Sequence, residues 1–248
     1  MSSTTNYLVT GANRGLGKGL VSAYLARPNS IVIAAVRDVS SASAKALNDL
    51  PKGASSKLII VKIDSLDEGS PATAIKSLQV DYAIAHLNVV IANAGILNDY
   101  STVATVPLAA VKEHTAVNSY GPLLLFQATL PLLEKSEKPK FISIGSPMSS
   151  IGGIESRPFA MAAYSASKLF LHWFTKKIAQ EHPGLISVVL DPGFVQTDMG
   201  NAGAKRVGME EASTTIADSV DFLVTTIDGA TKETSGHFRT IEGGDFLW

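Results

Sequence analysis

The feature that most constrains the fold of this chain is a regular alternation of short apolar runs with longer amphipathic segments. Strands as continuously apolar as these runs are buried on both faces, as in a parallel sheet covered by helices. The predicted strands are NYLVT (6–10), SIVIAAV (30–36), KLIIVKI (57–63), LNVVIANA (87–94), KFISIG (140–145), LISVVLD (185–191) and a short seventh near GHFRTI (236–241). The predicted helices cover 16–27, 42–50, 67–79, 106–135, as two helices broken near Gly121 and Pro122, and 160–181. This order predicts an α/β fold of the Rossmann type, a doubly wound seven-stranded parallel sheet with helices on both faces.

Composition excludes several classes of protein. The 248 residues are 46% hydrophobic and 17% charged, with no Gly/Ser linker, repeat or shift in composition, so we expect one domain over 1–248. A net charge of -1 gives no basic field for nucleic acid or an anionic membrane. The chain has no cysteine and no carboxylate cluster, and its five histidines lack ligand-like spacing, so we expect no metal site and surface or capping positions for nearly all the histidines. The N-terminus does not read as a secretory signal, and no apolar run is long enough to span a bilayer, so we expect a cytoplasmic protein.

A glycine-rich turn, TGANRGLGKG (10–19), directly follows the first predicted strand. Gly11, Gly15 and Gly17 permit a tight turn into the next helix and let the backbone approach a pyrophosphate. The N-terminus of that helix adds free N–H groups and the positive end of its dipole. Glycine also simply ends strands, but the position within a βαβ unit favours dinucleotide binding.

The end of the second strand indicates which dinucleotide binds. NAD-binding proteins usually place an acidic residue there to accept hydrogen bonds from the ribose 2′-hydroxyl. This chain instead reads AAVRD (34–38), with Arg37 after two apolar residues and Arg14 in the glycine turn. Two guanidinium groups suit a 2′-phosphate, so we predict NADP, with NADPH preferred over NADH. The alternatives are that both arginines are solvated surface residues, or that Asp38 contacts the ribose.

The segment YSASK (164–168) places Tyr164 and Lys168 four residues apart, on one face of the helix predicted there. Tyrosine ordinarily has a pKa of about 10, too high for efficient acid–base chemistry at neutral pH. A nearby cation stabilises the phenolate and lowers that pKa. Alone, such a pair would be read as helix surface. With a dinucleotide turn in the same chain, it predicts a proton donor tuned by a lysine.

Taken together, these motifs resemble the short-chain dehydrogenase/reductase family, in its order and over nearly the whole chain. TGANRGLG matches the cofactor turn, KID (62–64) the third strand end, NAG (93–95) the fourth-strand signature and DPGFVQTDM (191–199) the Pro-Gly segment. The resemblance implies that Asp64 contacts the adenine and Thr197 holds the nicotinamide carboxamide. Its full set of cofactor-binding residues is Gly11, Asn13, Arg14, Gly15, Leu16, Gly17, Arg37, Asp64, Asn93, Ala94, Gly95, Tyr164, Lys168, Pro192, Gly193, Val195 and Thr197.

The resemblance also implies the remaining catalytic residues. Ser146, in FISIGSPMSS (141–150), would polarise the substrate carbonyl, and Asn118, in VNSYGP (117–122), would hold a water that relays protons to Lys168. Ser146 precedes Tyr164 by 18 residues, an unusually long separation for the family, so Ser149 remains an alternative, with Ser143 and Ser150 nearby. For Asn118 the alternative is a helix-interior asparagine that bonds to backbone and kinks the helix.

The opening NYLVTGANRGLGKGLVSAYLARPNSIVIAAVRD (6–38) resembles fungal ketoreductases related to norsolorinic acid reductase. The end GHFRTIEGGDFLW (236–248) resembles carbonyl reductases of the sniffer and C-factor type. The resemblance implies an NADPH-dependent carbonyl reductase, assembled as a homodimer or homotetramer through the helices expected over 118–135 and 160–181. Apolar residues in the substrate loop 147–161 and in the segment 192–210 predict a hydrophobic ketone or aldehyde. The alternatives are an NAD-linked alcohol dehydrogenase of the same family and a non-catalytic dinucleotide sensor.

Overall fold

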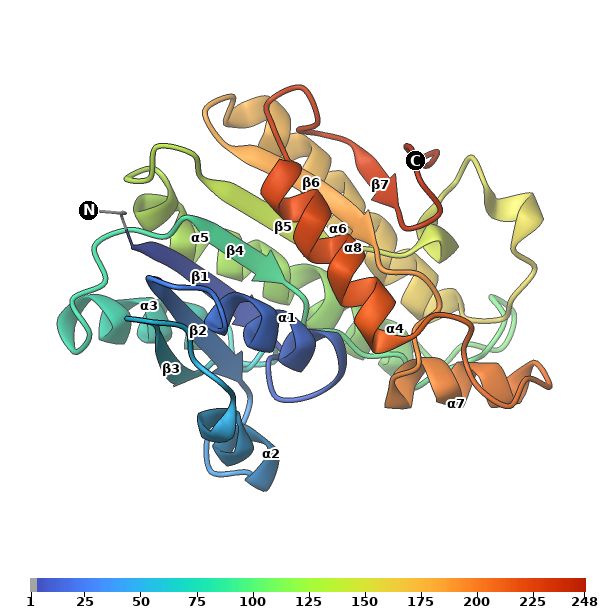
Figure 1. The fold of residues 1–248 in the computed structure, drawn as a ribbon. Coiled ribbons are helices and arrows are strands. Elements are labelled where there is room, and N and C mark those ends of the chain that lie inside the picture. Colours follow the sequence, from blue (N-terminus) through green and yellow to red (C-terminus); the bar gives the residue numbers. More distant parts are fainter. Residues whose placement is uncertain (1–3) are drawn as a thin grey trace.

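Seven parallel strands form one sheet in the computed structural model, which describes residues 4–248 (Figure 1). The strands are β1 (Thr5–Thr10), β2 (Ser30–Val36), β3 (Lys57–Lys62), β4 (Val89–Ala92), β5 (Lys140–Ile144), β6 (Ile186–Asp191) and β7 (Phe238–Thr240). Their order across the sheet is β3-β2-β1-β4-β5-β6-β7, and every neighbouring pair is parallel. All seven predicted strands are present, which confirms the predicted fold class.

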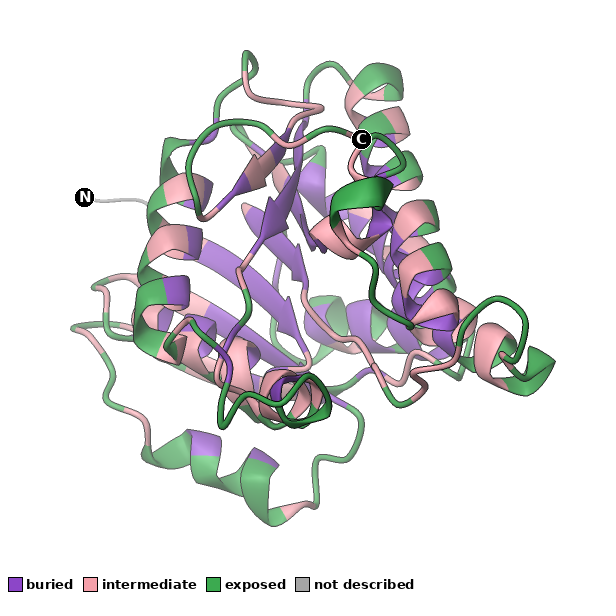
Figure 2. Cartoon of the chain, turned by 90° about the vertical axis from the view of Figure 1, so that its right-hand side faces the viewer, coloured by how far each residue is buried: buried purple, intermediate pink, exposed green. Residues whose placement is uncertain are grey.

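Helices cover both faces of the sheet, as the continuous apolar strands require. On one face, α1 (Gly15–Leu25) and α8 (Ile216–Gly229) pack over a buried apolar cluster, next to α2 (Ala42–Lys45) and the 3₁₀ turn η1 (Ala46–Asp49). On the other, α3 (Ser70–Val80), α5 (Gly121–Leu133) and α6 (Ala162–Glu181) cover a second cluster, and α4 (Leu108–Thr115) packs on α6. Figure 2 shows the resulting layers, with buried strands between helices whose outer faces are exposed.

Two departures from the predicted helices matter for the site. The helix predicted over 106–135 is not broken near Gly121 and Pro122 but continues through the π-helical turn η2 (Ala116–Tyr120). Pro122 lies in the first turn of α5, where its missing N–H is tolerated. In addition, α8 and the short helix α7 (Asp198–Arg206) were not among the predicted helices.

The segment 147–161 is a loop with two 3₁₀ turns, η3 (Pro147–Ser149) and η4 (Ile154–Ser156). The C-terminal residues hold it from one side. Gly152 donates its backbone N–H to the carbonyl oxygen of Trp248 at 2.9 Å, and the guanidinium carbon of Arg157 lies 4.5 Å from the ring centre of Phe246. The loop is therefore anchored at its middle as well as at its ends.

Within residues 4–248, no helix is both long and apolar enough to cross a membrane. The same part of the chain contains no group of three or more His, Cys, Asp or Glu side chains placed to hold a metal ion.

Candidate active site

The candidate residues meet at the carboxyl ends of the strands, on both sides of the junction between β1 and β4. The chain continues from β1 to β2 on one side of this junction and from β4 to β5 on the other. Such a switch in strand order opens a crevice where doubly wound proteins bind ligands. The glycine turn follows β1, NAG follows β4, Ser146 follows β5 and the Pro-Gly segment follows β6. The topology thus gathers residues that lie far apart in sequence.

The glycine turn has the geometry that a phosphate-binding turn requires. Gly11 and Gly15 have positive φ angles of 62° and 51°, which side-chain-bearing residues rarely adopt. A Cβ atom at Gly17 would overlap the carbonyl oxygen of Gly11, so glycine is needed for this close approach. Helix α1 starts at Gly15, and no side chain caps its N-terminus at Arg14. Within the described part of the chain, its first N–H groups therefore have no capping side chain and are available to an anion.

A seam of hydrogen bonds joins the glycine turn to the segment after β4. The hydroxyl oxygen of Thr10 accepts from the backbone N–H groups of Asn93 and Ala94, both at 3.0 Å. The side-chain amide of Asn93 donates to the carbonyl oxygen of Thr10 at 2.8 Å. The seam holds the two sides of the crevice in register. The side chain of Asn93 is thus used mainly to fix the backbone of the site.

The residues expected around the adenosine lie at the ends of β2 and β3. Arg37 is exposed directly after β2, and among residues 4–248 it forms no ion pair. Asp38 accepts from the backbone N–H and hydroxyl of Ser40 at 2.8 and 2.6 Å, and these hydrogen bonds lower the pKa of Asp38. Arg14 pairs weakly with Asp198 at 3.4 Å, with both side chains largely exposed. Both arginines are free to reorient toward a phosphate.

Two further adenosine-end side chains already have protein partners. The side-chain amide of Asn13 donates to the hydroxyl of Ser43 at 2.8 Å, which ties the glycine turn to α2. A carboxylate oxygen of Asp64 accepts from the backbone N–H of Leu66 at 3.0 Å, within the turn after β3. Each of these residues therefore shapes the edge of the crevice.

Tyr164 and Lys168 lie one turn apart on α6, and both are buried. The ammonium of Lys168 donates to the carbonyl oxygen of Ile144 at 2.7 Å and lies 6.0 Å from the ring centre of Tyr164. Burial lowers the pKa of Lys168 to about 8. The pKa of Tyr164 is raised to about 12, because burial outweighs the lowering effect of a hydrogen bond with Ser146. The predicted lowering of the tyrosine pKa by Lys168 is therefore not seen in this structure, where desolvation is the larger effect.

Ser146 has the best geometry of the candidate serines. It is buried, it lies near enough to Tyr164 to lower the pKa of that phenol, and its hydroxyl accepts from Met148 N–H at 3.3 Å. Ser143 is bonded to Thr175 inside the core. Ser149 is buried, and its hydroxyl has no hydrogen-bond partner among residues 4–248. Contact with Tyr164 therefore favours Ser146 over Ser149.

Asn118 lies in the π-helical turn and is fully buried. Its carbonyl oxygen accepts from Ile96 N–H at 2.8 Å, and its amide donates to the Ile96 carbonyl and the Ser167 hydroxyl at 3.0 and 2.9 Å. Gly95 lies between Asn118 and Lys168: a Cβ atom there would be 3.1 Å from Asn118 Oδ1 and 3.5 Å from Lys168 Nζ. Asn118 thus bonds to backbone in an irregular helix, and its Oδ1 approaches the same side of Gly95 as the lysine ammonium.

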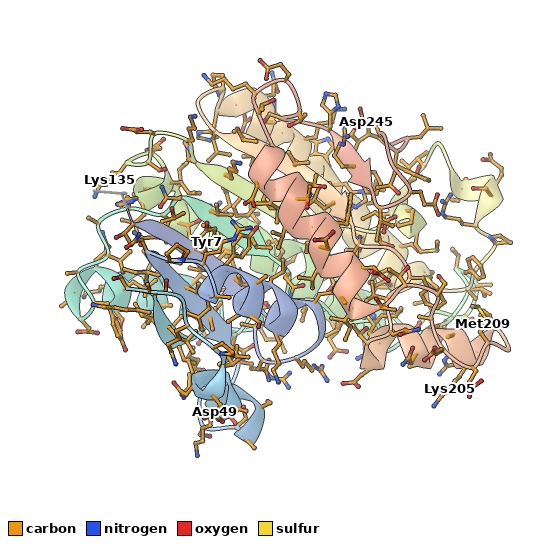
Figure 3. All side chains as sticks on the ribbon, in the orientation of Figure 1. Tyr7, Asp49, Lys135, Lys205, Met209 and Asp245 are labelled. Atoms are coloured by element: carbon orange, nitrogen blue, oxygen red, sulfur yellow. The ribbon has the colours of Figure 1, made fainter. Side chains whose placement is uncertain are left out.

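The Pro-Gly segment leads from β6 into α7. Asp191 ends β6, is buried, and accepts from Gly193 N–H at 2.9 Å; burial raises its pKa to about 6. Val195 is buried, and the hydroxyl of Thr197 accepts from Gly200 N–H at 3.1 Å, which caps α7. A Cβ atom at Gly15 would lie 3.1 Å from Thr197, so this segment touches the glycine turn. Figure 3 shows Lys205 and Met209 at the outer end of α7 and just beyond it.

Two histidines expected at surface or capping positions are buried instead. His172 lies one turn after Lys168, and its Nε2 accepts from the backbone N–H of Ser146 at 3.2 Å. Burial lowers the pKa of His172 to about 3, so it is neutral near neutral pH. His114, on α4, bonds to the Ala110 carbonyl at 2.8 Å and is also buried. The i, i+4 spacing from Lys168 was the available signal for His172, since it places both side chains on one helix face.

The arrangement fits a nicotinamide dinucleotide. Cβ atoms would crowd the turn at Gly11, Gly15 and Gly17 and the space at Gly95, so these positions keep the crevice open. Backbone N–H groups at the start of α1 suit the pyrophosphate, and the buried Tyr164, Ser146 and Lys168 lie at the other end of the crevice. The site can therefore bind a dinucleotide and transfer a proton beside it.

Comparison with known proteins agrees with this geometry. The family model described as short chain dehydrogenase matches residues 5–207. Norsolorinic acid ketoreductase of Dothistroma septosporum is 50% identical, with 99% of this chain and 93% of that protein covered. The norsolorinic acid ketoreductase of Emericella nidulans is 46% identical, over 98% of this chain and 94% of that protein. The predicted resemblance to these ketoreductases is confirmed.

Solved structures give the same relationship. An NADPH-bound carbonyl reductase from chicken fatty liver superposes with a TM-score of 0.85 at 30% identity, over 100% of both chains. The carbonyl reductase Sniffer of D. melanogaster superposes with a TM-score of 0.84 at 28% identity, over 99% of this chain and 100% of that one. The predicted similarity to sniffer-type carbonyl reductases is likewise confirmed.

Proposed function

Because this chain belongs to the short-chain dehydrogenase/reductase family, we propose that it is an NADPH-dependent ketoreductase acting on a hydrophobic ketone or aldehyde. The observation that carries the proposal is the burial of Tyr164, Ser146 and the ammonium of Lys168 together, with Ser146 near enough to Tyr164 to lower the pKa of that phenol and Lys168 one helical turn away. A hydroxyl pair of this kind can grip one carbonyl oxygen from two sides. The ketoreductase and carbonyl reductase names of the relatives support the same class of substrate.

The residues of this chain would share the work as follows. When bound, NADPH supplies the hydride that adds to the carbonyl carbon. Ser146 donates a hydrogen bond to the carbonyl oxygen and polarises it, and Tyr164 transfers its Oη proton to that oxygen as negative charge develops. Lys168, held by Ile144 O at 2.7 Å, stabilises the resulting phenolate. The high pKa of Tyr164 keeps the proton on the phenol until the carbonyl oxygen takes it.

Asn118 would resupply the proton. Asn118 Oδ1 and Lys168 Nζ approach the same side of Gly95, and this supports a water between them that passes a proton to the lysine and on to Tyr164. Asn118 Oδ1 accepts one hydrogen bond from Ile96 and keeps a second lone pair for such a water. The bonds to Ile96 and Ser167 then position the relay rather than exclude it.

The preference for NADPH rests on the charges at the end of β2. Ala35 and Val36 are buried and apolar where an NAD enzyme usually has its acid, and Arg37 follows them, exposed and unpaired among residues 4–248. Asp38 is turned to Ser40. In Arg37→Ala, we expect the ratio of NADPH affinity to NADH affinity to fall by about tenfold or more. The ratio for Arg37→Lys should lie between those of Arg37→Ala and the wild type. An unchanged ratio in Arg37→Ala would count against a phosphate contact.

The substrate side is apolar. The loop 147–161 exposes Ile151, Ile154 and Phe159, and Phe194 is exposed at the start of the Pro-Gly segment. These side chains support a bulky, aromatic or polyketide-like carbonyl compound rather than a small charged acid. We further propose a cytoplasmic homodimer or homotetramer, in which Phe170 and Trp173, exposed on α6, meet a second copy.

Replacement of Tyr164 by phenylalanine tests the proposed reaction. We expect turnover with NADPH and an aromatic ketone to fall by at least about a hundredfold, because the proton donor is lost. The affinity for NADPH, measured by fluorescence titration, should equal that of the wild type. Tyr120→Phe removes the same hydroxyl from an exposed residue and should leave both quantities unchanged. Substantial turnover by Tyr164→Phe would refute the assigned role.

A further inference from the structure

The loop after β4 carries Tyr100, a residue without a role in the reaction proposed above. This loop is fixed in place by hydrogen bonds at three points. Ile96 bonds to Asn118, Asn98 N–H donates to His114 at 3.4 Å, and the Ser101 carbonyl accepts from Ala162 N–H at 3.0 Å. The last bond ties the residue after Tyr100 to the first turn of α6, two positions before Tyr164. Tyr100 is therefore held by rigid parts of the fold beside the proposed proton donor.

The ring of Tyr100 lies against α7. The guanidinium carbon of Arg206 is 4.0 Å from the ring centre, a cation–π contact that holds the ring beneath the end of the helix. A Cβ atom at Gly203 would be 3.8 Å from the Tyr100 hydroxyl oxygen and 3.5 Å from the ring of Phe194. The hydroxyl and the Phe194 ring thus approach one point under α7. Because residue 203 is glycine, the space that a methyl group would fill there is left open.

The hydroxyl of Tyr100 is buried and has no hydrogen-bond partner among residues 4–248. Leaving such a group unpaired costs about 1–3 kcal/mol, so orphaned polar atoms are rare and call for an explanation. Burial raises the pKa of Tyr100, which keeps the phenol protonated and able to donate. The bond from Ala162 to Ser101 places Tyr100 near the start of α6, where Tyr164 lies, and the two phenols also interact electrostatically.

We propose that Tyr100 determines specificity by donating a hydrogen bond to a second oxygen of the substrate, apart from the carbonyl that is reduced. The proposal rests on the ketoreductase function and narrows its substrate to aromatic ketones that carry a further hydroxyl or carbonyl group. The exposed Phe194 ring offers apolar contact to a flat ring system, and the Tyr100 hydroxyl selects its oxygen substituent. A site that hydrogen-bonds a substrate oxygen discriminates strongly against analogues lacking it.

A matched pair of substrates and variants tests this assignment. Turnover with NADPH would be compared for 1-tetralone and its 5-, 6- and 7-hydroxy derivatives. We expect the wild type to favour at least one hydroxylated ketone, and Tyr100→Phe to lower kcat/KM for that compound about tenfold while leaving 1-tetralone unchanged. Tyr120→Phe, at an exposed tyrosine, should change neither. Equal losses on both ketones, or no preference in the wild type, would overturn the proposal.

Binding separates this proposal from the proposed reaction. Calorimetry on the NADP⁺ complex measures the affinity for the same ketones without turnover, so absent turnover would refute the ketoreductase function alone. Tyr100→Phe should weaken only the hydroxylated ligand, and Gly203→Ala, which fills the space beside both rings, should weaken both ligands. The melting temperature of Tyr100→Phe should not fall, because the lost hydroxyl has no hydrogen-bond partner among residues 4–248. Loss of folded stability, or no loss of affinity for the hydroxylated ligand, would refute the role of Tyr100.

Discussion

Replacing Lys168 by methionine separates the chemistry of this lysine from its effect on stability. Its pKa is lowered from 10.5 to about 8 because burial disfavours the charged form. Below about pH 8 the folded protein must hold a buried ammonium, whereas the unfolded chain holds a solvated one. A lysine with a depressed pKa therefore destabilises the fold at neutral pH, and this effect fades as pH rises toward the ordinary value.

The size of the effect follows from the shift. One pKa unit corresponds to about 1.36 kcal/mol, so the lysine costs about 3 kcal/mol at pH 7 and about 1 kcal/mol at pH 9.5. Methionine has a similar length and no charge, so it removes this pH-dependent cost. It also leaves the Ile144 carbonyl without its 2.7 Å bond, which adds an offset that does not change with pH. The stability of the variant minus that of the wild type should therefore fall by about 2 kcal/mol from pH 7 to pH 9.5, whatever the size of the offset.

Urea unfolding followed by circular dichroism at both pH values measures this change. Lys76→Met, at an exposed position on α3, is the matched control and should differ from wild type by the same amount at both. Tyr164 is present in all three proteins, so its own titration largely cancels. A difference for Lys168→Met that stays constant or grows with pH would show that the lysine is not desolvated as described.

Three further outcomes are expected. Gly17→Ala should weaken NADPH binding at least about tenfold in a fluorescence titration, because its Cβ overlaps a backbone oxygen of the turn, whereas Gly184→Ala, with open space around it, should not. His172→Leu should lower kcat about tenfold with NADPH affinity unchanged, because the backbone N–H of Ser146 loses its acceptor; equal kcat would contradict this positioning role. Trp173→Asp should shift the sedimentation coefficient toward that of a monomer, and an unchanged value would place the subunit contact elsewhere.

The sequence was most informative where the chain is buried on both faces. Each predicted strand is an apolar run bounded by turn residues, and burial leaves such a run few alternatives to a central parallel strand. The glycine turn could also be predicted from the sequence, because the positive φ angle at Gly11 and the close backbone contact at Gly17 require glycine. The carboxyl ends of the strands then determine which motifs meet.

Helices α7 and α8 were not predicted because the sequence signal of α7 is weak and that of α8 is confined to its first turn. Helix α7 reads DMGNAGAKR, with two glycines and one large apolar residue, so its helix propensity is low and it presents almost no apolar run. Helix α8 had a readable start: Thr215 accepts from Asp218 N–H at 3.1 Å and donates to its carboxylate at 2.6 Å. That Thr-x-x-Asp spacing before an apolar run is a capping pattern.

Within the site, residue identity was easier to predict than electrostatics. The positions of Tyr164 and Lys168 follow from helix geometry, but the direction of the tyrosine pKa depends on how much apolar material surrounds it. The burial of His172 and the orphaned hydroxyl of Tyr100 depend on contacts between segments far apart in the chain. Spacing along a sequence does not encode such contacts, so they required the three-dimensional structure.

The hydrogen bonds that Thr10 makes to Asn93 and Ala94 also limit how the two sides of the crevice can move apart. An amide held by the hydroxyl of another strand exchanges its hydrogen with solvent only when the two strand ends part. The rate at which the amide protons of Asn93 and Ala94 exchange in D₂O therefore reports how often the ends of β1 and β4 separate. A ligand that contacts both sides of the crevice should lower this exchange rate, whatever reaction it later undergoes.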